Sequence, residues 1–309
     1  MAKVAIVGCG AMGSVYAALM VDAGHEVHAV TLWEDHAAAM ARNGLRVEGA
    51  SGDRTVPIHA STSTADIGPC DLVIIATKAF DVEAAARSVI PLLNARTTVQ
   101  AIQNGLGSAE RVAAIIGPDQ LAVGVVGGFG ASLRGPGHVH HNGMEMIRFG
   151  SYAGLPRSAL AASAAVWESA GFRVRLFEDL RQMVWEKLIF NVTFSGPSAL
   201  TGMTIGEIMA NPHAWQVADA CTHEAVAVAN AAGIRLDVGD PYEHVRKLGE
   251  RIPGARPSML LDFLAGRRCE IDVINGAIPR EGARLGVPTP VNDTVVALVK
   301  AREAGFPRN

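Results

Sequence analysis

The stretch KVAIVGCGAMGSVYAALMVDAGHEV, residues 3–27, decides the fold of the chain. Its first five residues, KVAIV, are typical of a buried parallel strand, and three glycines follow at the G-x-G-x-x-G spacing. An apolar segment of helical length comes next, then a stop at Gly24 and a second strand, EVHAVTL, that begins at Glu26. This order of strand, glycine turn, helix and strand predicts the first unit of a Rossmann-type parallel sheet that binds a dinucleotide.

The three glycines of the turn have separate roles in such a unit. Gly8 allows the tight turn, Gly10 lets the backbone approach a pyrophosphate, and Gly13 lets the helix pack close to the strand. The phosphates then rest on the helix N-terminus. A glycine turn without a ligand is the alternative, and the complete context of strand, helix and second strand favours the dinucleotide.

The same region resembles a targeting segment, because 18 uncharged residues run from Val4 to Val21. The glycines interrupt that run, so neither a signal peptide nor a membrane span is predicted. A net charge of −3 and a pI near 6.4 predict no nucleic-acid or membrane partner. We expect a cytoplasmic protein that acts on a small molecule.

The cysteines are far apart and include no C-x-x-C pair, which predicts neither a disulfide framework nor a metal centre. They are Cys9, Cys70, Cys221 and Cys269. We expect all four to be reduced thiols, as is usual in the cytoplasm.

Two more apolar runs, in DLVIIATKAFD and TTVQAIQNGLG, are followed by Lys78 and Asn104. In an open parallel sheet the ligand lies outside the carboxyl ends of the strands, so both residues are expected to face the cofactor. The alternatives are a solvated loop lysine and a turn residue before Gly105.

Residues 124–150 are rich in glycine and polar side chains, and we interpret them as hairpin-like strands that complete the sheet. His138 and His140 alternate, so they would share one strand face. No third metal ligand is evident in the sequence, and we assign no role to these histidines or to His141.

The second half of the chain reads as helical. Apolar periodicity predicts helices over 180–195, 204–232, 241–251, 257–266 and 270–285, with prolines at their boundaries. A length of 309 residues suggests two domains. We predict an α/β chain with a dinucleotide-binding Rossmann domain at 1–178, a helical substrate and dimerisation domain at 179–309, and the active site in the cleft between them.

Lys187 stands out because it lies in the otherwise apolar segment WEKLIFNVTFSG. Lys187, Asn191 and Ser195 are spaced at i, i+4 and i+8, so they share one polar stripe of a helix. A lysine in this setting needs a carboxylate nearby, and Glu270 is the candidate. The alternative is that Glu270 is only a cap in the first turn of a helix.

Five motifs carry a resemblance over nearly the whole chain. They are GCGAMG at 8–13, TKAFD at 77–81, QNGLG at 103–107, WEKLIFN at 185–191 and SMLLDFLAGRRCEIDVING at 258–276. Together they resemble ketopantoate reductase, or 2-dehydropantoate 2-reductase. The resemblance implies NADPH-dependent reduction of the 2-oxo group of ketopantoate to pantoate, in the pathway to pantothenate and coenzyme A.

Residue roles follow from the resemblance, position by position. It implies catalysis by Lys187 as proton donor with Glu270, and substrate binding by Asn191, Ser195, Ser258 and Asn104. The cofactor contacts that it implies are Gly8, Cys9, Gly10, Ala11, Met12, Gly13, Thr31, Lys78, Asn104, Gly130 and Glu270. It implies no metal.

The chain also departs from the family pattern. Ser195 and Ile205 stand where the family usually has two substrate asparagines, and Gly130 replaces a common alanine. Leu261 and Cys269 replace residues that are often Gln and Thr. A reductase for another 2-oxo acid or an imine is therefore the alternative to ketopantoate, and a non-catalytic dinucleotide sensor is a third reading.

The cofactor preference depends on VTLWEDH at 30–36, the end of the second strand. Thr31 supplies neither a cation for a 2′-phosphate nor an acid for the ribose. Glu34 and Asp35 would repel a 2′-phosphate if they turned inward, whereas Lys78 and Arg42 could compensate. The resemblance favours NADPH with NADH as the alternative. We expect a homodimer formed through the helical domain.

Overall fold

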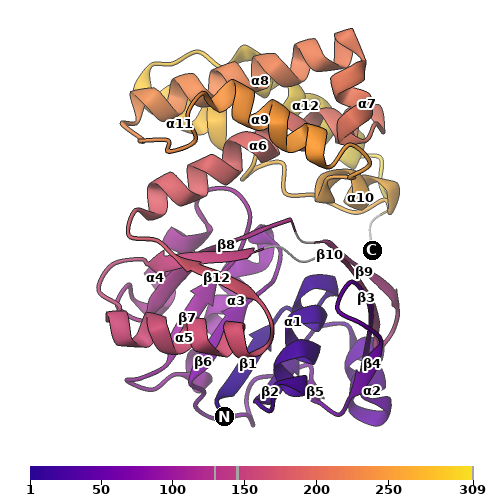
Figure 1. The fold of residues 1–309 in the computed structure, drawn as a ribbon, viewed down its shortest axis with the longest axis vertical. Helices are drawn as coiled ribbons and strands as arrows, with labels where there is room; N and C mark the ends of the chain where they lie inside the picture. The colour runs from indigo at the N-terminus through magenta and orange to yellow at the C-terminus, as the bar shows by residue number, and fades with distance from the viewer. Residues whose placement is uncertain (129, 144–145, 308–309) are drawn as a thin grey trace. The chain divides into compact units, whose positions relative to one another are not determined.

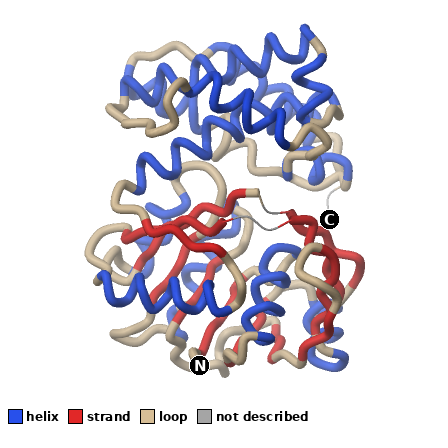
Figure 2. Tube along the Cα trace, viewed as in Figure 1, coloured by secondary structure: helices blue, strands red, loops and turns tan. Residues whose placement is uncertain are grey.

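The computed structural model describes residues 1–128, 130–143 and 146–307. It divides the chain into two compact units, Met1–Gln103 with Gly107–Leu180, and Asn104–Leu106 with Arg181–Asn309. Figure 2 shows that the strands belong to the first unit, and the second unit is built from helices in its described part. The predicted class, a Rossmann-type sheet followed by an all-helical domain, is confirmed.

The first unit contains an eight-stranded sheet in the order β12-β11-β8-β7-β6-β1-β2-β5. From β5 to β8 this is the strand order of a dinucleotide-binding sheet, and only the β8–β11 pair within it is antiparallel. The strands are β1 (Lys3–Val7), β2 (Glu26–Val30), β5 (His59–Ser61), β6 (Leu72–Ile75), β7 (Thr98–Ala101), β8 (Leu121–Gly127), β11 (Met146–Ser151) and β12 (Arg173–Leu176).

A second sheet of four strands has the order β4-β3-β10-β9. Its strands are β3 (Leu45–Gly49), β4 (Arg54–Val56), β9 (Gly130–Gly135) and β10 (His138–Gly143). The interpretation of 124–150 as strands is correct, although positions 129, 144 and 145 lie outside the described residues. Its assignment to one sheet is wrong, because β9 and β10 pair with each other and β10 continues in parallel to β3, while only β8 and β11 join the main sheet.

Helices cover both faces of the main sheet, as the alternation along β1 requires. Val4 and Ile6 pack on one face with residues of α1 and α5, whereas Ala5 and Val7 pack on the other face with residues of α3 and α4. The helices of this unit are α1 (Ala11–Asp22), α2 (Glu34–Asn43), α3 (Val82–Ser88), α4 (Ser108–Ile116) and α5 (Arg157–Ser169), with short 3-10 turns η1 (Ala79–Asp81) and η2 (Ile90–Leu92).

Helix α1 lies between the two sheets (Figure 1). It contacts β1 and β2 of the main sheet and β3, β9 and β10 of the second sheet, and its residues from Gly13 to Met20 are all buried. A helix that is covered on all sides has no polar face. This burial explains the long uncharged run at 4–21.

The helical unit is arranged around α8, which contacts α7, α9, α11 and α12. Its helices are α6 (Leu180–Thr201), α7 (Ile205–Ala210), α8 (Pro212–Ala231), α9 (Pro241–Arg251), α10 (Ser258–Leu264), α11 (Ala277–Leu285) and α12 (Pro290–Glu303). The predicted 204–232 helix is two helices, because Asn211 caps α8 with its side-chain oxygen and Pro212 begins it. Helix α12 follows the last predicted segment and was not expected.

Pro197 lies inside α6, so the predicted helix boundary there is wrong. Packing holds the helix together across the proline: a methyl group added at Gly196 would lie 2.5 Å from the Val295 side chain. The Asn275 amide also donates to the carbonyl oxygen of Val192 at 2.9 Å. Such contacts outweigh the cost of one missing backbone hydrogen bond.

The expected helix over 270–285 is also corrected, because α11 begins only at Ala277. Glu270 lies in a series of turns before the helix, where Val273 N and Ile274 N both donate to the Glu270 carbonyl at 3.2 Å. Glu270 is therefore not a residue of a first helical turn. Among the described helices none is both long and apolar enough to cross a membrane.

Candidate functional site

The glycine turn joins β1 to α1 beside the end of β2. The amide groups of Gly8 and Cys9 donate to the carbonyl oxygen of Val30 at 2.9 and 2.8 Å. Gly8 has a φ of +93°, and a methyl group added to it would lie 2.5 Å from the Thr77 nitrogen. This glycine is required by the turn and by the close approach of the chain after β6.

Gly13 and Gly10 differ in what surrounds them. A methyl group added at Gly13 would lie 2.8 Å from the carbonyl oxygen of Gly8, so Gly13 is required by packing of α1 against the turn. At Gly10 such a methyl group would meet no atom of the described residues within 4 Å. The open space at Gly10 is where a pyrophosphate lies in this fold, so the residues present fit a dinucleotide.

The other predicted cofactor residues of this unit follow strands of the main sheet or begin α1 and β9. Lys78 is half-buried and follows β6, and Thr31 is buried and follows β2. Ala11 and Met12 begin α1 and are half-buried. Gly130 begins β9, where an added methyl group would lie 3.2 Å from the Asn142 side chain.

Cys9 is fully buried, and its sulfur lies 3.5 Å from Ser14 Oγ. Burial raises the pKa of the Cys9 thiol to about 12, so the thiol is neutral at physiological pH. Its side chain belongs to the core, and any contact with a cofactor at this position comes from its backbone.

In the helical unit, Lys187, Asn104 and Glu270 form one chain of hydrogen bonds. Lys187 Nζ donates to Asn104 Oδ1 at 2.9 Å, and Asn104 Nδ2 donates to Glu270 Oε2 at 3.4 Å. The three residues are far apart in the sequence. Lys187 was predicted to lie near Glu270, and the amide of Asn104 bridges the two residues.

A short loop holds Asn104 in this position. The Leu106 amide donates to the carbonyl oxygen of Val273 at 2.9 Å. Gly105 has a φ of +81°, and a methyl group added to it would lie 2.0 Å from that same oxygen. Gly105 and Val273 therefore fix the loop. The sequence predicted only a turn at Asn104 and Gly105, without the contact to Val273.

The remaining predicted substrate residues are distributed over α6 and α10. Asn191 is half-buried and Ser195 is buried, one and two turns after Lys187 on α6. Ser258 is exposed at the start of α10. Ile205 is 2% exposed and lies in the core of the helical unit, so this departure from the family pattern changes core packing as well as polarity.

The histidine pair on β10 faces Glu48 of β3. His138 Nε2 lies 3.1 Å from Glu48 Oε2, and His140 Nδ1 lies 3.3 Å from Oε1. These contacts are the main cause of a lowered pKa of the Glu48 carboxyl. In the described ranges no group of three or more His, Cys, Asp or Glu side chains is arranged to hold a metal ion.

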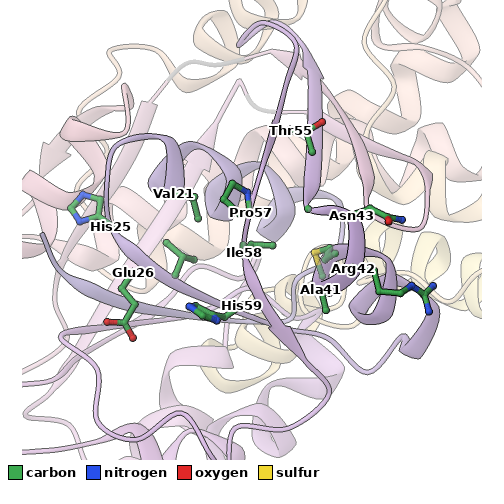
Figure 3. A pocket seen from close by; sticks show the side chains of 13 residues that line it. Val21, His25, Glu26, Ala41, Arg42, Asn43, Thr55, Pro57, Ile58 and His59 are labelled. Atoms are coloured by element: carbon green, nitrogen blue, oxygen red, sulfur yellow. The ribbon is translucent and has the colours of Figure 1, made fainter.

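A hollow of about 620 Å³ lies elsewhere in the first unit. Figure 3 shows Glu26 at one side of it and Arg42 at the other, with Val21 and Ile58 between them. The hollow is at the amino end of β2, whereas the glycine turn is at the carboxyl end. Arg42 lies in the last turn of α2, roughly 12 Å along the helix from Glu34, and lines this hollow; its compensation for a 2′-phosphate stays a prediction.

The comparisons with known proteins cover both units. The family model described as ketopantoate reductase PanE/ApbA matches residues 4–154, and the model of its C-terminal part matches residues 179–303. The chain is 31% identical over 304 residues to a 2-dehydropantoate 2-reductase of Archaeoglobus fulgidus, covering 98% of this chain and 99% of that one.

Solved structures are similar over the same length. A PanE/ApbA family ketopantoate reductase from Ralstonia eutropha JMP134 superposes with a TM-score of 0.90 at 33% identity, covering 98% of each chain. A D-mandelate dehydrogenase, solved with NADH and anilino(oxo)acetate, superposes with a TM-score of 0.91 at 26% identity, also covering 98% of each chain.

Proposed function

The chain belongs to the ketopantoate reductase family, and we propose that it reduces the 2-oxo group of ketopantoate to the hydroxyl group of pantoate, with NADPH as the reductant. The family is one of NADP-dependent oxidoreductases. The observation that carries the proposal is the bridge from Lys187 through Asn104 to Glu270, because it holds an ammonium group beside an amide and a carboxylate.

Lys187 is the proposed proton donor. The reduced nicotinamide, when bound, supplies a hydride to the carbonyl carbon of the substrate. The negative charge that develops on the carbonyl oxygen is stabilised by the Lys187 ammonium, which then gives that oxygen its proton. Asn104 orients the ammonium through its Oδ1, and Glu270 orients the Asn104 amide in turn.

Substrate binding is assigned to Asn191, Ser195, Ser258 and Asn104. The spacing of Asn191 and Ser195 after Lys187 on α6 supports this assignment, since all three share one face of the helix. We assign residues 1–178 to dinucleotide binding and residues 179–309 to substrate binding and dimerisation.

The cofactor contacts are proposed for Gly8 to Gly13, Thr31, Lys78, Asn104, Gly130 and Glu270. The space left open at Gly10 supports a pyrophosphate there. NADPH is the proposed cofactor because of the family, and NADH is included because a similar D-mandelate dehydrogenase was solved with it.

We also infer a cytoplasmic homodimer. The four cysteines are free and buried, which supports a reducing compartment. Leu261 and Leu264 on α10 are 37% and 62% exposed and support an interface on the helical unit. Light scattering of the purified protein tests the dimer, and a monomeric mass at micromolar concentration would exclude it.

A second candidate is the reduction of another 2-oxo acid. The similarity to D-mandelate dehydrogenase favours an aromatic substrate, and Ser195 and Ile205 replace the two asparagines expected of a ketopantoate site. A serine hydroxyl makes fewer hydrogen bonds than an amide, and isoleucine makes none.

One assay separates these candidates. Purified protein is mixed with NADPH or NADH and with ketopantoate, 2-oxo-2-phenylacetate, smaller 2-oxo acids or a cyclic imine, and the loss of nicotinamide absorbance is followed. The highest kcat/KM with ketopantoate supports the main proposal, and the highest with the phenyl compound supports the second. Tight cofactor binding without turnover of any substrate would support a sensor instead.

A further inference from the structure

An exposed aromatic side chain lies just beyond the end of β2. Trp33 is 41% exposed and follows the last strand residue, Val30, by three positions. Its neighbour Leu32 is 87% exposed. The pair therefore offers apolar surface at the carboxyl end of β2, the edge of the sheet where ligands bind in this fold.

His36 supports the Trp33 ring from one side. The two rings are stacked, with centroids 5.1 Å apart and planes inclined by 11°. His36 itself is fully buried. One face of the Trp33 ring is therefore covered by His36. The exposed part of the ring is directed away from His36.

Both ring nitrogens of His36 form hydrogen bonds. The Gly137 amide donates to Nδ1 at 2.9 Å, and Nε2 lies 3.0 Å from Ser14 Oγ. Because Nδ1 accepts, the proton of the neutral ring is on Nε2 and is donated to Ser14. Burial lowers the pKa of His36 and so favours this neutral form. The ring cannot rotate without breaking both hydrogen bonds.

The location of this pair matches one part of a dinucleotide. In a parallel sheet of this order the adenosine half lies beyond the carboxyl end of the second strand. Val30, the last residue of β2, accepts hydrogen bonds from the glycine turn itself. Trp33 is thus a short distance along the chain from the proposed pyrophosphate position.

We propose that Trp33, backed by His36, is a stacking platform for the adenine ring of the cofactor. The inference rests on the proposed function only in requiring a dinucleotide. Aromatic rings bind bases through their faces, without contact to a 2′-phosphate. Stacking on the base would therefore supply affinity that NADH and NADPH share.

Calorimetry with four probes tests the platform. NADH, NADPH and ADP-ribose contain adenine, and reduced nicotinamide mononucleotide lacks the adenosine half. Trp33→Ala should weaken binding of the three adenine compounds by about tenfold, the usual effect of losing one stacked base. Trp33→Phe keeps a ring and should stay within about threefold of the wild type.

Ile90→Ala is the matched control, because Ile90 is a 53% exposed apolar residue of the same unit in η2. It should leave every affinity unchanged, and no variant should change the affinity for the mononucleotide. Unchanged NADH affinity in Trp33→Ala would overturn the proposal. An equal loss for the mononucleotide would also overturn it, because the effect would then not concern adenine.

His36→Asn tests the positioning role of His36, since Asn lacks the ring but keeps an acceptor near the Gly137 amide. The KM for NADH should rise by about threefold or more while kcat at saturating NADH stays unchanged. A loss of thermal stability with an unchanged KM would reduce His36 to a structural residue. Absence of 2-oxo acid turnover would overturn the proposed function and leave the binding result intact.

Discussion

Replacing Asn104 by alanine removes both hydrogen bonds of the bridge between Lys187 and Glu270 at once. The bond from the Lys187 ammonium is 2.9 Å long and involves a charged donor, whereas the contact with Glu270 is 3.4 Å and weaker. Hydrogen bonds to charged groups contribute about 1.5–3 kcal/mol. A loss of about 2–3 kcal/mol of transition-state stabilisation corresponds to a fall in kcat/KM of about 30- to 150-fold.

The assay is steady-state reduction of the best 2-oxo acid with NADPH, together with thermal unfolding of each variant. Asn104→Asp keeps an oxygen for Lys187 but places a second carboxylate beside Glu270, so it should retain more activity than alanine if the lysine bond dominates. Asn94→Ala is the control, because the Asn94 side chain accepts the Arg96 amide in a loop at the opposite end of the strands. A kcat/KM of Asn104→Ala within twofold of the wild type would refute the bridge.

Three further predictions concern the glycine turn, the carboxylate and the buried histidine. Gly10→Ala should keep its folding stability but bind cofactor about tenfold more weakly by calorimetry, because no described protein atom lies within 4 Å of the added methyl group. Gly13→Ala should lower the free energy of unfolding by more than about 1 kcal/mol, because its methyl group would lie 2.8 Å from a carbonyl oxygen. Equal effects of Gly10→Ala and Gly13→Ala on cofactor binding would contradict the assignment of a binding role to Gly10 and a packing role to Gly13. Glu270→Gln removes the charge that positions the bridge and should lower kcat/KM by about tenfold in the same kinetic assay, and an unchanged value would leave Glu270 with a structural role only. The pKa of His36 is lowered from 6.5 in the folded protein, so its contribution to stability is complete above about pH 6.5 and is lost as the pH falls toward the folded value. Urea unfolding should therefore show a steeper loss of stability below about pH 6.5 in the wild type than in His36→Asn, and parallel curves would exclude this contribution.

The start of the main sheet in the first unit was predictable from the sequence because its signals are local. The strand, the three glycines and the next strand adjoin one another in residues 3–27, so the whole motif can be read in one short stretch. The second sheet was not predictable, because β3 pairs in parallel with β10 about ninety positions later. The second sheet covers the side of α1 that the main sheet leaves open. The uncharged run at 4–21 could therefore not be explained from the sequence.

In the helical unit, packing between distant residues overrides a helix end that the local sequence predicts. Pro197 reads as a helix end, yet α6 continues through it because Val295 and Asn275 pack against the preceding residue. The stripe from Lys187 to Ser195 was predictable from spacing alone. The bridge was not, since Asn104 reaches Lys187 from 83 residues away and Glu270 from 166 residues away.

The central claim is that this chain reduces a 2-oxo acid with Lys187 as the proton donor. The most direct measurement compares the kcat of the wild type and of Lys187→Ala with NADPH and ketopantoate, with cofactor affinity measured in parallel. We predict turnover by the wild type and a fall in kcat of about 10²–10⁴ in the variant, with NADPH affinity retained. Near-normal turnover by Lys187→Ala would contradict the account.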